Sequence, residues 1–266
     1  MKEYKRILWH VIIAVCTVSC GHNVQEAPGN NAMSQVVFIP EQNGYELVWQ
    51  DDFDGSELDT TKWHSRSDGP RRVGFNDPRM IEVKDGNLLL KYDIIGNRVL
   101  GCAVGTQGRF ETRYGYFEAR IKLQHSIGPW AAFWIQSPKI SQGEDPAGFG
   151  AEIDIFEYFK ELGDSVACSC VHWAYGPNMQ STDSMESHMA GLEKGFHTFG
   201  LEWTSDKYSF FIDGLKFHEV TEGISQTEEY MILSMELPEM LENIKMACAP
   251  DTMAVDWVKV YSRITE

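Results

Sequence analysis

Residues 148–160 read GFGAEIDIFEYFK and place three acidic residues inside an apolar run. A buried strand should be almost purely apolar, because taking an unpaired ionised carboxylate out of water is costly. Side chains alternate along a strand, so Glu152 and Asp154 point to one face, whereas strict alternation would place Glu157 on the other. A β-bulge at residues 155–156 adds one residue and returns Glu157 to the face of the other two acids. The sequence therefore predicts a bulged strand with three carboxylates on one face and apolar side chains on the other.

Short runs of strand character recur along the chain between clusters of Gly, Asp, Asn and Pro. In GYFEARIKL (115–123), apolar residues alternate with polar and charged ones, which is typical of a strand with one face on the core. A hairpin turn is indicated at Asp213 and Gly214. Helical patterns are few: LDTTKW and PEMLENIKM each predict a turn or two, and STDSMESHMAGLEKG indicates a loop. Regularly spaced strands with little helix predict an all-β fold, an antiparallel sandwich or barrel.

The start of the chain differs from the rest in composition. Residues 1–19 join a basic start to an apolar run that ends in a serine, and Cys20 follows directly. This pattern resembles a bacterial lipoprotein signal, whose cleavage leaves Cys20 as the lipid-bearing N-terminus; the alternative is an ordinary secretory signal cut slightly later. Residues 20–35 are rich in Asn, Gly, Pro and Ala and indicate a flexible tether. We expect residues 36–266 to form a single folded domain.

The lipoprotein interpretation also predicts a location. A lipid-anchored chain would be attached to a bacterial membrane in the cell envelope and would face outside the cytoplasm. An ordinary signal would instead predict a secreted protein. The lipid-anchored protein would have the membrane as a partner through its N-terminal anchor.

The charge of the chain limits its partners. The formal net charge is −16, which argues against a nucleic-acid partner, since a phosphate backbone binds basic surfaces. It weighs mildly against a strongly sulfated polymer as well. We therefore expect neutral partners.

Four cysteines lie in the predicted folded domain, at positions 102, 168, 170 and 248. They lack the paired spacing of a zinc site. Cys168 and Cys170 are two residues apart, so on a strand they share a face and would not readily bond to each other. One or two disulfides and small buried thiols are both open interpretations.

Aromatic residues lie close to the acids in the sequence. In GPWAAFWIQ, alternation puts Trp130 and Trp134 on one face, and HWAYG adds His172 and Trp173. A pyranose stacks its flat apolar face on an aromatic ring while its hydroxyls bond to polar side chains, so we expect these four residues to bind substrate. A tryptophan taken alone is more often a core residue. His172 has two open interpretations: it reaches the acids, or it bonds to a backbone carbonyl.

The row of acids suits one kind of chemistry in particular. Two carboxylates that flank a glycosidic bond can hydrolyse it, because one attacks the anomeric carbon while the other protonates the leaving oxygen. Crowding of like charges splits their pKa values and keeps one acid ionised and another protonated near neutral pH. Two other interpretations compete: acids on the solvent face of an amphipathic strand are ordinary, and calcium also binds carboxylates. A calcium loop is usually rich in Asp and Gly, unlike this apolar run.

Over roughly residues 45 to 262 the chain resembles glycoside hydrolase family 16. The similar segments are ELVWQDDFDGSELDTTKW, YGYFEARIKL, WAAFWI, EIDIFE, HTFGLEWTSDKYSFFIDG and AVDWVKVYS, of which EIDIFE, the bulged form of the catalytic signature, is the most specific. The resemblance implies a β-jelly roll, an antiparallel β-sandwich with a substrate groove on its concave face. It also implies a retaining mechanism with Glu152 as nucleophile, Asp154 as assisting acid and Glu157 as general acid/base.

The resemblance further implies a structural calcium on the face away from the groove. Asp256 and the backbone of Gly86 match the positions that supply its ligands, although Asp256 could equally cap a sheet edge or pair with a lysine. Catalysis itself would need no cofactor.

Several functions remain open within this resemblance. Relatives that act on β-1,3-glucan often carry an Asn-Glu-Leu-Gln-Tyr type of run where this chain has RRVGFNDPRMIEV, so glucans, agar-like galactans and host glycans all stay possible. We expect a monomeric, endo-acting β-glycosidase that hydrolyses a β-linked polysaccharide or glycan by double displacement. A transglycosylase would use the same carboxylates. A lectin on the same fold is the contrasting hypothesis, but it would be expected to have lost one of the three acids.

Overall fold

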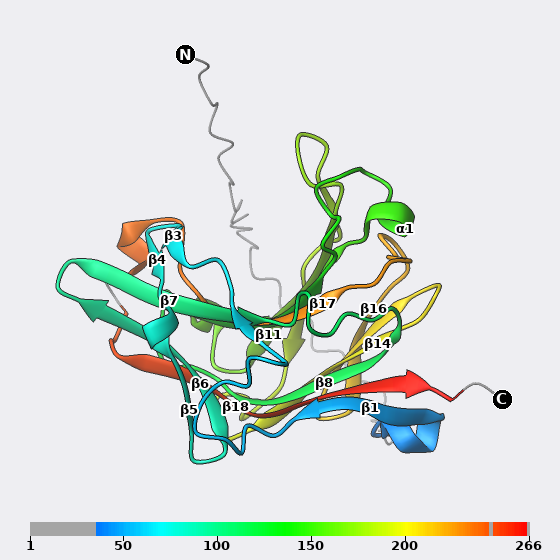
Figure 1. Cartoon of the computed structure of the whole chain (residues 1–266), viewed down its shortest axis with the longest axis horizontal. Coiled ribbons are helices and arrows are strands. Elements are labelled where there is room, and N and C mark those ends of the chain that lie inside the picture. The colour runs from blue at the N-terminus through cyan, green and yellow to red at the C-terminus, as the bar shows by residue number, and fades with distance from the viewer. Residues whose placement is uncertain (1–35, 245–246, 265–266) are drawn as a thin grey trace, which may run out of the picture. The chain divides into compact units, whose positions relative to one another are not determined.

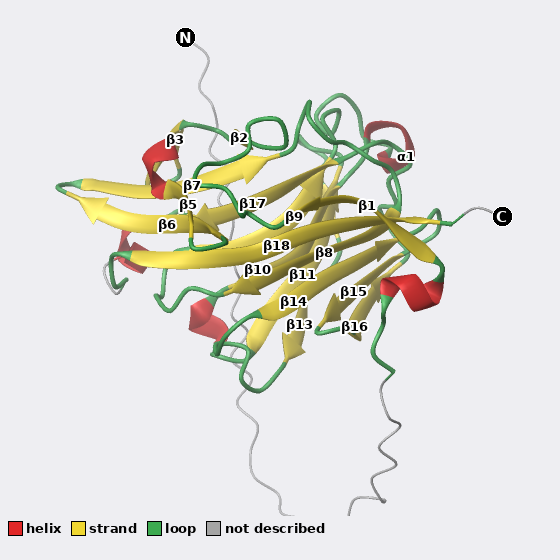
Figure 2. Cartoon of the chain, turned by 60° about the horizontal axis from the view of Figure 1, so that its bottom comes forward, coloured by secondary structure: helices red, strands yellow, loops and turns green. Residues whose placement is uncertain are grey.

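The computed structural model describes residues 36–244 and 247–264. They form a sandwich of two antiparallel sheets, which we call the back sheet and the front sheet (Figures 1 and 2). This architecture confirms the predicted all-β sandwich. The predicted signal segment 1–19, with Cys20 and the tether 20–35, lies outside the described residues. Within the described ranges no helix combines the length and apolar character needed to cross a membrane.

The back sheet is organised around its longest strand. Its strands are β1 Tyr45–Asp51, β5 Ile81–Lys84, β6 Asn87–Ile95, β8 Gly115–Lys122, β14 His197–Trp203, β15 Tyr208–Ile212, β16 Leu215–Val220 and β18 Asp251–Arg263. One edge of β18 pairs with β8, while the other edge pairs first with β6 and then with β1. The sheet continues beyond β8 through β14, β15 and β16, and beyond β6 through β5.

The front sheet carries the acidic strand. Its strands are β2 His64–Ser65, β7 Arg98–Gly105, β9 Trp130–Gln136, β10 Glu152–Tyr158, β11 Val166–Trp173, β12 Gln180–Ser181, β13 Met185–His188 and β17 Tyr230–Glu236. They pair in the order β2, β7, β17, β9, β10 and β11, and both β12 and β13 pair with β11. The acidic strand β10 is therefore an interior strand with a partner on each side.

Short elements connect and flank the two sheets. They are β3 Gly69–Arg71, β4 Gly74–Asn76, the helix α1 Pro146–Phe149, and the 3-10 helices η1 Pro40–Asn43, η2 Pro78–Met80, η3 Lys160–Leu162 and η4 Leu241–Ile244. β3 and β4 form a hairpin that pairs in parallel with β7, and a β6–β7 hairpin joins the two sheets. In Figure 1 the β3–β4 segment and α1 rise on opposite sides, above β11 and β17. These two segments therefore flank the outward face of the front sheet.

The alternation in residues 115–123 predicts β8 correctly. Phe117, Ala119 and Ile121 point into the core between the sheets and are fully buried. The predicted hairpin turn joins β15 to β16, with Asp213 and Gly214 at φ angles of 49° and 72°, as a tight hairpin turn requires.

The predictions for the weaker patterns were only partly correct. Most of the run STDSMESHMAGLEKG is loop, but it contains β13. The prediction missed this strand because most of its side chains are exposed, so the sequence shows no apolar alternation there. PEMLENIKM contains the one-turn helix η4, and LDTTKW forms a hydrogen-bonded turn.

The core lies between the two sheets and is rich in aromatic rings. Phe156 of β10 stacks on Phe199 of β14, with ring centroids 3.9 Å apart and the rings inclined by 25°. Both side chains are fully buried. This contact fixes the acidic strand against the back sheet.

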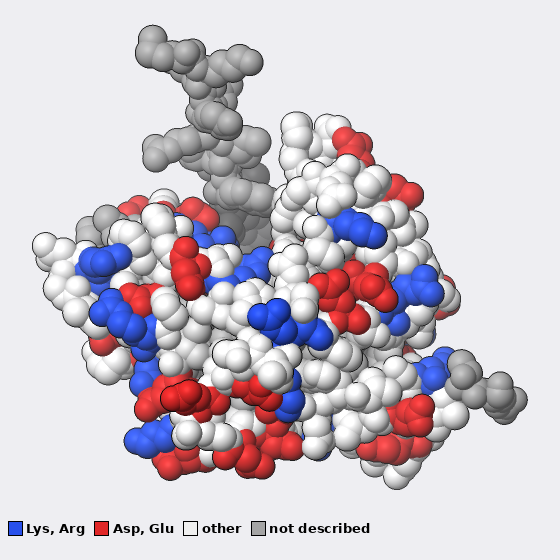
Figure 3. Space-filling model, in the orientation of Figure 1, with Lys and Arg blue, Asp and Glu red and all other residues white. Residues whose placement is uncertain are grey.

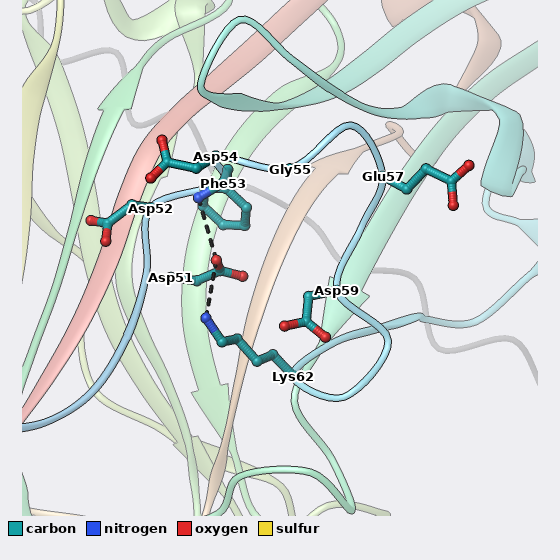
Figure 4. A pocket seen from close by; sticks show the side chains of 8 residues that line it. All are labelled: Asp51, Asp52, Phe53, Asp54, Gly55, Glu57, Asp59 and Lys62. Carbon is teal, nitrogen blue, oxygen red and sulfur yellow. Dashed lines mark hydrogen bonds and ion pairs between the residues drawn. The ribbon is translucent and has the colours of Figure 1, made fainter.

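An acidic segment at the end of β1 has a structural role. Asp51 is buried and accepts a hydrogen bond from Nε1 of Trp63 at 2.8 Å. Figure 4 shows its carboxylate between the backbone nitrogen of Phe53 and Nζ of Lys62, at 3.3 and 3.2 Å. The pocket around it is lined also by Asp52, Asp54, Gly55, Glu57 and Asp59. Since three donors satisfy Asp51, this acid ties β1 to the buried Trp63.

Truncating the stacked ring should show how much the acidic strand depends on the core. We expect Phe156→Ala to lower the free energy of unfolding by about 3–5 kcal/mol, because it removes a large buried side chain and leaves a cavity. Urea denaturation followed by tryptophan fluorescence measures the change. Val48→Ala, at a site that is 47% exposed, is the control and should change little. A loss below about 1 kcal/mol for Phe156→Ala would contradict this account of the core.

Candidate active site

The predicted bulge is present in β10. In the pairing with β9, Asp154 lies opposite Trp134 but Phe156 lies opposite Phe133, so β10 holds one extra residue at this point. Ile155 and Phe156 both point into the core and are almost fully buried. The bulge prediction is confirmed. As a consequence, the three acids share the outward face of the front sheet.

Each acid has a different polar partner on a neighbouring strand. Oε2 of Glu152 accepts a hydrogen bond from Nε2 of Gln136 at 2.7 Å. Oε1 of Glu157 accepts one from the indole Nε1 of Trp130 at 3.0 Å. Oδ2 of Asp154 lies 3.3 Å from Nε2 of His172. The site therefore consists of three buried or half-buried carboxyls, each held by a donor from β9 or β11.

The surroundings of Glu152 raise its pKa. Burial contributes most, repulsion from Asp154 adds to it, and the pKa of Glu152 rises to about 7. A hydrogen bond with Tyr175 and the charges of His172 and Arg66 oppose this rise. Glu152 is therefore ionised in a substantial fraction of molecules at neutral pH.

Glu157 holds its proton more strongly. Burial and repulsion from Asp154 raise its pKa to about 8, against the hydrogen bond from Trp130, which favours the ionised form. The two outer acids thus differ in the direction that double displacement requires, with Glu152 losing its proton first.

His172 reaches the acids, which decides between the two interpretations of this residue. Burial opposes its protonation, but the hydrogen bond and the charge of Asp154 prevail and raise the pKa of His172 to about 11. An imidazolium at this point offsets part of the negative charge of the three carboxyls.

Trp130 and Trp134 lie on the acid face, but their rings are not bare. They are 7% and 6% exposed, and their indole N–H groups bond to Glu157 and to Oγ of Ser234. The guanidinium carbons of Arg72 and Arg66 lie 4.7 and 4.6 Å from the ring centroids of Trp130 and Trp134, respectively. In this arrangement arginines occupy the ring faces where a sugar was expected to stack.

Trp173 lies on the other side of the front sheet. It packs against the core between the sheets, and its ring contacts the backbone at Gly223 so closely that a Cβ there would lie 2.5 Å from a ring atom. Its neighbour His172 points toward the acids, and consecutive residues on a strand point to opposite faces. The structure therefore gives Trp173 a packing role and places Tyr175, next to Glu152, on the site side.

The arginines of the site were missed in the sequence. Arg71 and Arg72 lie 2.9 and 3.5 Å from the buried carboxylate of Glu236. Arg66 bonds to Gln136 and has no carboxylate within ion-pair distance among the described residues. Two adjacent arginines begin the run RRVG at a turn, which could have indicated functional residues. Nothing in the sequence, however, linked this run to β9 or β10.

Two groups of residues carry atoms that could ligate a metal. One ligand atom each from Glu152, Asp154 and His172 lie within 4.8 Å of one another. Asp154 and His172 are paired with each other at 3.3 Å, and the carboxyls can serve acid–base chemistry without a metal. Asp256 is engaged by the guanidinium of Arg120, and Gly86 lies in the turn between β5 and β6. The carboxylate is already neutralised by a cation, so this pair fits calcium poorly, and the calcium site stays a prediction.

The four cysteines of the folded region are free thiols in the structure. Cys102, Cys168 and Cys170 are buried, and Cys248 is exposed. Cys168 and Cys170 are on β11, where they lie opposite Glu157 and Asp154 of β10, respectively. As expected, the two cysteines share a face. Small buried thiols are thus the better description of three of the four.

Comparison with known proteins agrees with this site. The sequence model of a protein family described as "Beta-porphyranase A-D, GH16 domain" matches residues 48–263. The chain belongs to glycoside hydrolase family 16. The predicted resemblance is confirmed, and the chain is assigned to the glycoside hydrolases.

Individual relatives of this family 16 hydrolase differ in their substrates. It is 26% identical to a glucan endo-1,3-beta-glucosidase A1 from Niallia circulans, over 82% of this chain and 38% of that protein. It is also 26% identical to a keratan-sulfate endo-1,4-beta-galactosidase from Sphingobacterium multivorum, over 82% of this chain and 55% of that protein. This chain thus matches well under two thirds of the length of each of these relatives.

Solved structures of family 16 share the fold. The crystal structure of a laminarinase from Flavobacterium sp. UMI-01 superposes with a TM-score of 0.66 at 25% identity, covering 82% of this chain and 100% of that chain.

The raised pKa values predict how activity depends on pH. We expect kcat/KM to rise as Glu152 loses its proton near pH 7 and to fall as Glu157 loses its proton near pH 8, which gives a narrow bell. Trp130→Phe removes the donor that favours ionised Glu157, so the falling limb should move to higher pH. Initial rates from pH 5 to 10 test both statements. A falling limb that stays in place in Trp130→Phe would show that it does not report Glu157.

Proposed function

We propose that the chain is a retaining, endo-acting β-glycosidase that hydrolyses a β-linked polysaccharide by double displacement. The observation that carries this proposal is the bulged strand β10, which sets Glu152, Asp154 and Glu157 on one outward face. Membership of family 16 over residues 48–263 supports the same reaction.

The roles of the two outer acids follow from their environments. Glu152 attacks the anomeric carbon while Glu157 donates its proton to the leaving oxygen, which gives a covalent glycosyl-enzyme intermediate. Glu157, now ionised, then takes a proton from water, and the resulting hydroxide displaces Glu152. Two inversions at the anomeric carbon restore its configuration. Glu152 has the lower pKa of the two, which suits it to be the nucleophile.

Asp154 acts on both outer acids. Its charge raises the pKa of both outer acids, so it keeps Glu157 protonated before the first step. His172 holds its carboxylate from β11. Asp154 therefore assists without bonding to the sugar carbon.

We infer that the favoured substrate is a β-galactan with anionic substituents. One relative is named as a keratan-sulfate endo-1,4-beta-galactosidase, which supports this class. Arg66 supplies a guanidinium on the acid face with no carboxylate partner among the described residues, and it suits a sulfate or carboxylate group. Figure 3 shows basic side chains lying among acidic patches, so the net charge of −16 is not a uniform negative surface. This proposal differs from the expectation of neutral partners, which stays a prediction. A neutral β-glucan, as the name of the glucanase relative suggests, is the competing substrate.

The two alternatives use the same face. Transglycosylation differs only in that a sugar hydroxyl replaces water in the second step. A binding-only protein is disfavoured because all three acids are present and their pKa values are split in the catalytic direction.

A substrate panel with matched variants tests the enzyme proposal. The panel holds keratan sulfate, chemically desulfated keratan, porphyran, laminarin and mixed-linkage β-glucan. We expect the wild type to cut the sulfated galactans best, Glu152→Gln to cut none, and Glu157→Ala to be about 10²–10⁴-fold slower. NMR of the first product should show the β-anomer. Glu46→Gln, at an exposed site on β1, is the control and should keep full activity.

Each outcome of the panel has a separate meaning. An α-anomer as first product would refute retention, and equal binding without cleavage by wild type and Glu152→Gln would favour the lectin. Preference for laminarin would replace the galactan by a glucan. Longer products in the presence of acceptor sugars would indicate transglycosylation.

We also propose that Cys20 carries a lipid that anchors the chain in a bacterial cell envelope, outside the cytoplasm. The proposal is supported by the basic start, the apolar run and the small residue before Cys20. Expressed in a bacterium, the chain should incorporate labelled palmitate and partition into detergent, and Cys20→Ser should do neither. Cys16→Ser is the matched control and should behave like the wild type. Labelling that survives in Cys20→Ser would contradict the proposal, and release into the medium would favour a secreted protein.

A further inference from the structure

Gln136 at the end of β9 lies at the centre of the front sheet's polar network. It is opposite Glu152 in the pairing with β10 and opposite Tyr230 in the pairing with β17. Its side chain is buried, at 7% exposure. Nε2 donates to Oε2 of Glu152 at 2.7 Å and lies 3.5 Å from Oη of Tyr175. Oε1 accepts from Oη of Tyr230 at 2.8 Å and from Nη2 of Arg66 at 3.0 Å.

The chemistry of these partners allows one orientation of the amide. A guanidinium has donors and no acceptor, so the amide atom that faces Arg66 must be the oxygen. The NH₂ group then faces Glu152, and an ionised carboxylate can only accept from it. With two bonds accepted and two donated, the buried amide is fully satisfied. A flipped amide would set donor against donor at Arg66 and oxygen against oxygen at Glu152.

Arg66 is itself held in place by contacts that do not involve Gln136. Its guanidinium carbon lies 4.6 Å from the ring centroid of Trp134, which is two residues before Gln136 on β9. Its backbone nitrogen donates to the carbonyl oxygen of Ala103 on β7 at 2.8 Å. The cation therefore has a fixed position beside β9, although it belongs to a segment 70 residues earlier in the chain.

We propose that Gln136 is a positioning residue for the nucleophile Glu152, and that Arg66 and Tyr230 act through it by fixing its amide. The inference rests on the proposed function for the role of Glu152. Its physical content is that Gln136 aims one carboxylate oxygen and favours the ionised form. Tyr230 bonds to Gln136, so it affects the nucleophile through that residue.

The titratable groups that act on Glu152 come from several elements, so the effect of Gln136 must be separated from theirs. They are Asp154 and Glu157 on β10, His172 on β11, Tyr175 after β11, Arg66 after β2 and Glu229 before β17. Each of these groups is still present when Gln136 or Tyr230 is replaced by an apolar residue, but Arg66 and Tyr175 lose their contacts with Gln136 in Gln136→Leu. Tyr230→Phe leaves both contacts in place, so the two variants together test the role of the amide.

The experiment measures the ionisation of Glu152 directly, without a substrate. Protein labelled with [5-¹³C]glutamate is titrated by NMR, and the Glu152 signal is identified by its loss in Glu152→Gln. We expect Gln136→Leu to raise the pKa of Glu152 by about one unit, because a donor to its ionised form is lost. Tyr230→Phe should raise it by less. In the Gln136→Leu background, Tyr230→Phe should cause no further shift, because Tyr230 acts through Gln136.

Arg72→Met is the matched control, since Arg72 covers Trp130 as Arg66 covers Trp134 but does not bond to Gln136. The Glu152 titration should be unmoved in this variant. If Gln136→Leu does not fold, Tyr230→Phe alone decides, because it deletes one hydroxyl and keeps the ring. A Glu152 pKa that is unchanged in Tyr230→Phe and in any folded Gln136→Leu would overturn the proposal.

Kinetics on a polymer that the wild type cleaves give the second readout. We expect Gln136→Leu to lower kcat on the order of 10-fold to 100-fold with a smaller change in KM, as for a misplaced catalytic group. If no polymer is cleaved but the Glu152 pKa shifts as expected, the proposed function fails while the positioning role stands. If a polymer is cleaved and neither the pKa nor kcat changes in these variants, the positioning role fails alone.

Discussion

The β-bulge at Ile155 and Phe156 is the constraint on which the site depends. Without the extra residue, Glu157 would point between the sheets, into the space that Phe156 shares with Phe199. A carboxylate buried there without a partner would be costly, and the outward face would lose one of its three acids. The bulge instead sends two apolar side chains inward and leaves the acids outward. Core packing and the spacing of the three acids are thus set by the same local irregularity.

Burial of the acids gives the site its chemical character. Desolvation is the largest cause of the raised pKa values of Glu152 and Glu157, and repulsion from Asp154 adds to both. The partners of the two acids differ: Glu152 has an amide, a phenol and the charges of His172 and Arg66, whereas Glu157 has an indole N–H and the charge of His172. A common apolar setting with unequal partners is how one strand holds an ionised and a protonated carboxyl at the same pH.

Much of the site was predictable because strand alternation is a local property. Alternation placed Glu152, Asp154, Trp130 and Trp134 on one face. The bulge was predicted because Glu157 is one residue out of step with the alternation of the other two acids. The same rule would have separated His172 from Trp173, since consecutive strand residues face opposite ways, but the prediction grouped them by proximity in sequence. What alternation does not show is which loop covers the face. The arginine-bearing segment between β2 and β4 has no periodic pattern, so its position over the tryptophans was not predicted.

The sequence by itself determined the all-β class, the family and the three acids, because these depend on period-two patterns and on a short motif that keeps its spacing along one strand. The choice of a sandwich over a barrel came from the family resemblance and not from the patterns. The tertiary structure alone decided which groups surround those acids. Arg66, Gln136 and Tyr230 come from segments far apart in the chain and meet only because β2, β9 and β17 belong to one sheet. Their effect on Glu152 falls off steeply with distance and depends on hydrogen-bond geometry, and neither is encoded in residue spacing.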